Sequence, residues 1–186
     1  MATAGEITGL LQEAAQGDRA AFERLIPLVY DDLHRLAHHH RWRFGDPRAP
    51  GTTSLVHEAF MKIGDLTQLH GRTRGQFFCV AAKAMRSILI DNARRHSRRK
   101  REGRAVPVED VVLVSEERSD ELLALDEALE RLDQKEARLA RIVECRFFAG
   151  LTIDETAEAL EISPATVKRG WDEARVRLYK DLHGGA

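Results

Sequence analysis

The sequence predicts an all-α protein with two helical domains. Three observations favour this fold class: apolar residues recur at helical spacing, Pro and Gly number only 5 and 13 among 186 residues, and 32% of residues are charged. Hydrophobic residues make up 43% of the chain, which is enough for two modest cores. We therefore expect a charge-rich chain built from amphipathic helices.

The first half of the chain is predicted to begin with three helices. A helix over residues 6–15 ends before Gly17, and Asp18 caps the next one, whose apolar residues keep helical spacing from Phe22 to Ala37. Pro27 interrupts this run, and we expect it to kink or restart the helix because it removes one backbone hydrogen bond. After a loop over residues 44–52, a helix over residues 54–63 buries Leu55, Ala59, Phe60 and Ile63.

A polar loop over residues 64–75 leads into a long helix from Gln76 to about Arg99. Its core stripe is Phe77, Ala81, Ala84, Met85 and Ile88. Residues 103–120 lose this periodicity and contain Pro107 and many acids, so we interpret them as a linker. The linker segment VEDVVLV is either a short strand or an apolar clasp, and we favour the clasp.

Four helices are expected after the linker. The first spans Leu122 to Leu132, the second runs from Leu139 to Phe147 and stops at Gly150, and two short helices follow. The predicted organisation is an N-terminal helix (residues 1–17), a first helical domain (18–102), the linker (103–120) and a second helical domain (121–186).

Residues 151–178 have the pattern of a helix-turn-helix. Thr152 and Glu155 form a capping box, and Ser163 caps a second helix that begins at Pro164. Its buried face is predicted to hold Val167, Trp171, Ala174 and Leu178. Its outward face carries residues suited to the DNA major groove, namely Thr166, Lys168, Arg169, Arg175 and Arg177. The alternative is an ordinary helical hairpin with a solvated charged face.

Two residues depart from the usual helix-turn-helix pattern. Glu161 stands in the turn where Gly is frequent, and Gly170 lies inside the second helix. A helical Gly costs about 1 kcal/mol relative to Ala unless close packing requires it.

The net charge of −1 hides an uneven distribution. Eight Lys or Arg lie between Arg86 and Arg104, whereas eleven acidic residues face only three basic ones between Ala105 and Glu136. Such a change of sign indicates two partner surfaces or a domain boundary. The basic run from Arg94 to Arg104 is either a solvated helix end or a phosphate-binding segment.

Several function classes lack their sequence signatures. No apolar run approaches the length of a membrane span, so we expect a cytoplasmic protein. The chain has no Gly-rich phosphate loop and no nucleophile elbow, so we expect no enzyme and no cofactor. The two cysteines, Cys79 and Cys145, are expected to be reduced core residues.

A histidine cluster from His34 to His40 contains a pair at i, i+4 spacing. Such a pair can bind a metal from one helix face, but no carboxylate or Cys stands at ligand spacing nearby. We therefore expect no metal site and place these histidines at the surface.

Taken in order, three segments resemble a bacterial RNA polymerase sigma factor of the extracytoplasmic-function (ECF) type, which keeps only regions two and four. SLVHEAFMKI resembles the region-two helix that docks on the clamp of the polymerase, and FFCVAAKAMRSILIDNARRH resembles the helix that meets the minus-ten promoter element. The segment from Leu125, with RIVECRFFAGLTIDETAEALEISPATVKRGW, resembles region four. The resemblance covers nearly everything from Asp18 to Leu182.

The resemblance implies site residues in each region. The implied polymerase-binding residues are Leu55, Val56, His57, Glu58, Phe60 and Met61. The implied minus-ten residues are Gln68, His70, Arg72, Arg74, Phe78, Lys83, Arg86, Asn92 and Arg95. The loop over residues 66–75 would hold a base flipped from the stack, or is alternatively a plain polar loop. Ser54, His57, Phe78 and the insertion over residues 41–53 mark a subgroup.

The sequence thus predicts a sigma factor whose partners are core RNA polymerase and promoter DNA, with a possible anti-sigma factor as regulator. We expect a monomer without membrane contact, in which the helix-turn-helix reads the minus-thirty-five element. One rival is a helix-turn-helix regulator that acts as a dimer without polymerase. The other is a helical adaptor that binds no DNA, which the basic outward face of the last helix argues against.

Overall fold

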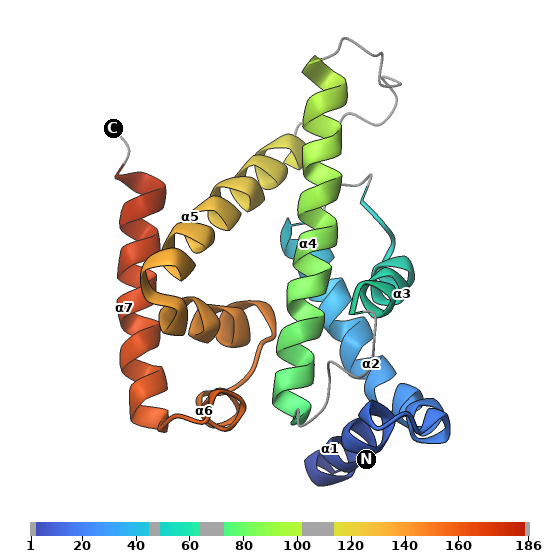
Figure 1. Cartoon of the computed structure of the whole chain (residues 1–186). Helices are drawn as coiled ribbons and strands as arrows, with labels where there is room; N and C mark the ends of the chain where they lie inside the picture. The colour runs from blue at the N-terminus through green and yellow to red at the C-terminus, as the bar shows by residue number, and fades with distance from the viewer. Residues whose placement is uncertain (1–2, 45–48, 64–72, 102–113, 185–186) are drawn as a thin grey trace.

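The computed structural model of the protein describes residues 3–44, 49–63, 73–101 and 114–184. Within these ranges every regular element is helical and no strand occurs. The helices in chain order are α1 (Ala4–Ala15), α2 (Arg19–Phe44), α3 (Thr52–Ile63), α4 (Arg74–Arg101), α5 (Val114–Val143), the π-helix η3 (Glu144–Phe148), α6 (Ile153–Leu160) and α7 (Pro164–His183) (Figure 1). The predicted all-α fold is confirmed.

Local capping explains where the first helices begin. The Thr3 side chain accepts a hydrogen bond from the Glu6 amide, and Asp18 Oδ1 accepts from the amides of Ala20 and Ala21 at 2.9 and 3.1 Å. Gly17 turns the chain between α1 and α2 with a φ of 96°. Both the break and the Asp18 cap agree with the prediction.

Helix α2 runs through Pro27 as a single helix, so the predicted restart does not occur. Leu25 and Val29, on either side of Pro27, are fully buried in the core. Their burial offsets the backbone hydrogen bond that Pro27 removes.

The starts of α4 and α5 differ from the predicted ones. Thr73 and Gln76 form a reciprocal cap, with Thr73 N to Gln76 Oε1 at 3.0 Å, so α4 begins at Arg74. Helix α5 begins at Val114, inside the predicted linker, and the rest of the VEDVVLV segment lies outside the described residues. Glu136 has non-helical angles (φ −148°, ψ 70°), and this kink separates the two helices that the sequence predicted there.

Helix α4 lies between two groups of helices, with α1, α2 and α3 on one side and α5, η3, α6 and α7 on the other (Figure 1). One contiguous apolar core extends across it. This core includes Leu11 from the N-terminal helix, Leu25, Phe77 and Met85 from the first predicted domain, and Leu122, Leu139 and Phe148 from the second. The two predicted domains are therefore packed against each other in a closed arrangement.

Candidate nucleic-acid interface

Helices α6 and α7 form the predicted helix-turn-helix. Thr152 N donates to Glu155 Oε2 at 2.8 Å and Glu155 N donates to Thr152 Oγ1 at 3.2 Å, which is the predicted capping box. Ser163 Oγ accepts from Thr166 N at 3.2 Å, and Pro164 is the first residue of α7. Glu161 ends α6 in the left-handed region (φ 55°, ψ 42°), where Gly is the usual residue.

The buried face of α7 contains Val167, Gly170 and Ala174, while Trp171 and Leu178 are half-buried against the core. Gly170 is explained by close packing, because a Cβ atom there would lie 2.6 Å from Ile142 Cδ1. The absence of a side chain allows α7 to approach α5 closely.

The basic residues predicted to contact the minus-thirty-five element lie on the exposed side of α7. Lys168 and Arg169 are exposed in its second turn, Arg175 is exposed further along, and none of these three forms an ion pair within the described part of the chain. Arg177 is exposed but pairs with Glu173 at 2.7 Å and with Glu136 of α5. Thr166 is half-buried, with its hydroxyl 2.8 Å from Ser163 Oγ.

Several residues predicted to contact the minus-ten element are buried. Phe78, Arg86 and Asn92 on α4 are at most 9% exposed. Arg74 is half-buried, donates to Asp32 Oδ2 at 2.9 Å and lies over the Phe78 ring at 4.8 Å. Of the remaining predicted minus-ten residues, Lys83 and Arg95 are exposed. Gln68, His70 and Arg72 lie outside the described residues.

Arg86 is the centre of a buried ion cluster between the two predicted domains. It donates to Asp126 Oδ1 at 2.8 Å and also to Glu144, while Arg94 donates to Asp126 Oδ2 at 3.2 Å. Burial raises the pKa of the Asp126 and Glu144 carboxyls, and the Arg86 charge opposes that increase. In this arrangement Arg86 binds carboxylates of the protein itself.

Only some of the predicted polymerase-binding residues of α3 are exposed at the surface. Leu55 and Val56 are fully buried and Phe60 is half-buried, in an edge-to-face contact with Phe22. The exposed members are His57, Glu58 and Met61, the last being 82% exposed. Lys62 Nζ of α3 donates hydrogen bonds to Ser87 Oγ and Asp91 Oδ2 of α4, at 2.7 and 3.0 Å.

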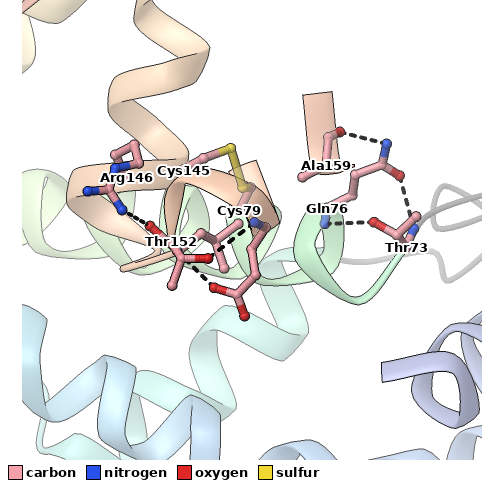
Figure 2. The surroundings of a disulfide bond; sticks show 9 residues. Thr73, Gln76, Cys79, Cys145, Arg146, Thr152 and Ala159 are labelled. Carbon is pink, nitrogen blue, oxygen red and sulfur yellow. Dashed lines mark hydrogen bonds between the residues drawn. A yellow bond between two sulfur atoms is a disulfide. The ribbon is translucent and has the colours of Figure 1, made fainter. Parts of the chain in front are cut away.

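The bonding of the cysteines and the location of one histidine differ from the prediction. Cys79 and Cys145 are joined in a disulfide between α4 and η3, so the expectation of two reduced thiols is wrong (Figure 2). The expectation of surface histidines is wrong for His40, which is buried with Nε2 2.9 Å from the Phe148 carbonyl oxygen. The partners lie 66 and 108 residues away along the chain, and no local sequence signal reveals such pairs.

Burial lowers the pKa of His40 to about 4, with smaller contributions from the nearby charges of His39 and Arg86.

Among the described residues, no group of three or more His, Cys, Asp or Glu is placed to hold a metal ion. None of the described helices is long and apolar enough to cross a membrane.

Comparison with known proteins agrees with this architecture. The family model of the ECF sigma factors matches residues 4–184, which is nearly the whole chain. The comparison with curated proteins found no match. Because the match extends from α1 to the end of α7, the chain belongs to the ECF sigma factor family, whose members are non-enzymatic factors in transcription initiation.

Proposed function

We propose that this protein binds core RNA polymerase and directs it to specific promoters. The observation that best supports this function is the exposed basic face of α7, where Lys168 and Arg169 follow a Ser163-capped helix start. A recognition helix reads base edges with side chains near its N-terminal end, which is where these two residues lie. We assign Arg175 and Arg177 to phosphates on the flank of the same site.

We assign polymerase docking to the exposed edge of α3. Glu58 accepts a hydrogen bond from Ser54 Oγ at 3.1 Å, and neighbouring Met61 supplies apolar surface. A charge beside an exposed apolar side chain is typical of a docking surface that fixes orientation. Leu55 and Val56 support this edge from within the core.

The closed arrangement has a consequence for the minus-ten assignment. Arg86 can reach DNA only after the second predicted domain moves off α4, because Asp126 and Glu144 of that domain bind its guanidinium. We infer that polymerase binding separates the domains, and that the free chain binds promoter duplex weakly. The acids between residues 109 and 136 add repulsion towards phosphate.

The direct test is transcription in vitro by core polymerase with the purified protein on a genomic library. We expect discrete start sites that depend on the protein. A folded Glu58→Lys protein, checked by circular dichroism, should lose polymerase binding in a pull-down, whereas Glu58→Gln should keep most of it. Tight specific binding of the free protein to duplex DNA as a dimer, without comigration with polymerase, would favour the regulator alternative.

The same experiments test the adaptor alternative and would also reveal an antagonist of the protein. An adaptor would support no transcription and would not respond to changes in Lys168 or Arg169. A specific antagonist, such as an anti-sigma factor, would have to cover the docking edge of α3 or the α7 face, and it would compete with polymerase in the same pull-down.

A further inference from the structure

The Cys79–Cys145 disulfide joins the two predicted domains. Cys79 lies on α4, Cys145 lies on η3, and their Cα atoms are 5.2 Å apart (Figure 2). The two cysteines are 66 positions apart along the chain, and the segment between them includes the whole predicted linker. The bond therefore closes a covalent loop across the contact between the domains.

This covalent link lies beside the α4 residues that we assign to the minus-ten element. Cys79 directly follows Phe78, and Arg86 lies two helical turns further along the same helix. Phe78 is buried, and Arg86 is covered by the second predicted domain, whose Asp126 and Glu144 bind the Arg86 guanidinium. As long as the bond is intact, α4 cannot move away from η3.

Beside the apolar core that both predicted domains share, several non-covalent contacts across the same interface are polar. Gln76 Nε2 donates to the Ala159 carbonyl oxygen at 2.9 Å, next to the disulfide in Figure 2, and His40 contacts the Phe148 carbonyl oxygen. Arg86 Nε, Glu144 Oε2 and His40 Nδ1 are buried without a hydrogen bond to any described residue. Buried polar groups that are incompletely paired weaken an interface, so the covalent bond adds to the closure that the shared apolar core provides.

We propose that Cys79 and Cys145 form a thiol–disulfide switch, in which the disulfide locks the minus-ten face of α4 against the second domain and reduction releases it. The gating of transcription by this switch rests on the proposed sigma function. The closure itself is a property of the fold.

The chemistry requires a dithiol as reductant. Cys145 is 2% exposed and Cys79 is half-buried, so a reductant thiolate reaches Sγ of Cys79 first. It forms a mixed disulfide there and expels the Cys145 thiolate, which takes up a proton. The second thiol of the reductant then displaces Cys79, so that the protein gains two thiols and the reductant becomes a disulfide. Exchange with an oxidised small-molecule disulfide runs these steps in reverse.

The structural test is hydrogen–deuterium exchange of the full-length protein with and without dithiothreitol, with free thiols counted by mass spectrometry. We expect reduction to speed exchange in residues 77–93 and 144–160 by about tenfold or more, because these segments face each other in the closed form. Cys79→Ser and Cys145→Ser should show the fast exchange without reductant and no further response to it. Unchanged exchange in a fully reduced protein would overturn the proposal.

The functional test compares oxidised and reduced protein in transcription with core polymerase. We expect the oxidised protein to lose about tenfold or more of its activity, restored by dithiothreitol, and both Ser variants to be active under either condition. Equal activity of the oxidised and reduced proteins would overturn the gating. If no form starts transcription, the proposed sigma function fails, and the exchange measurement alone decides whether the lock exists.

Discussion

Gly170 of α7 lies directly against Ile142 of α5. A Cβ atom at Gly170 would be 2.6 Å from Ile142 Cδ1 and 3.2 Å from Leu139 Cδ2. Ile142 is fully buried, so its side chain has little room to move away. The contact fixes how closely the recognition helix approaches the rest of the second domain.

Gly170→Ala is therefore expected to destabilise the protein although Ala favours helices. The helix propensity gain is about 1 kcal/mol, whereas overpacking a filled core costs about 1–3 kcal/mol, so we expect a net loss of about 1 kcal/mol. The change in the free energy of unfolding is measured by urea denaturation, with circular dichroism as the signal. Gly9→Ala is the matched control, because a Cβ atom there has nothing within 4 Å and should stabilise α1. Equal stabilisation by both changes would contradict the packing argument.

Glu161→Gly should stabilise the turn between α6 and α7. Glu161 adopts φ 55° and ψ 42°, a left-handed conformation that costs a residue with a Cβ atom about 1 kcal/mol more than Gly. We expect the free energy of unfolding to rise by about that amount. Glu158→Gly, inside α6, should lower it by a similar amount through helix propensity. Thermal unfolding of the two variants should thus shift in opposite directions.

Acid should destabilise the closed arrangement through His40. Its pKa in the folded protein is about 4, below the ordinary value of 6.5, so the unfolded state binds the proton first. Stability is then lost progressively as the pH falls from about 6.5 to about 4, by about 3 kcal/mol in total.

The measurement compares the wild type with His40→Gln in urea unfolding between about pH 7 and pH 5, since Gln can still donate to Phe148 but does not titrate. Asp126 and Glu144 have raised pKa values and act in the opposite direction, and both proteins contain them. The difference between the two curves therefore isolates the histidine. If the free energies of unfolding of the two proteins change in parallel with pH, protonation of His40 does not destabilise the folded protein.

Arg169→Ala should relax promoter specificity rather than weaken all promoters alike. Arg169 is exposed in the second turn of α7, where side chains reach base edges. We expect a cost of about 1–3 kcal/mol, confined to one or two base pairs of the minus-thirty-five element. Transcription from a set of promoter variants by the reconstituted holoenzyme measures this profile.

Arg177→Ala is the contrasting change. Arg177 lies two turns further along α7 and pairs with Glu136 and Glu173, so it can exchange these partners for a phosphate. All promoter variants should weaken by a similar factor, with a smaller dependence on salt. If Arg169→Ala acts uniformly and Arg177→Ala changes sequence preference, the helix is rotated differently on the DNA.

Most of the helices, and the caps of α2, α6 and α7, could be predicted from the sequence because the interactions that define them are local, although the starts of α4 and α5 were missed. Thr152 with Glu155, and Ser163 with Thr166, are three residues apart. Apolar spacing likewise predicted the buried stripe of α4, including Phe77 and Met85. The order of these segments along the chain was sufficient to predict the family that the comparison then showed.

Only the tertiary structure decided which faces of these helices are covered. An apolar stripe shows that a helix buries one face, but it does not specify the partner. Arg86 was predicted to face DNA, and it is instead buried on Asp126, 40 residues away. His40 and Cys79 likewise meet partners 108 and 66 residues distant. Such contacts depend on how the two predicted domains dock, and docking is a property of whole surfaces that no local pattern of residues encodes.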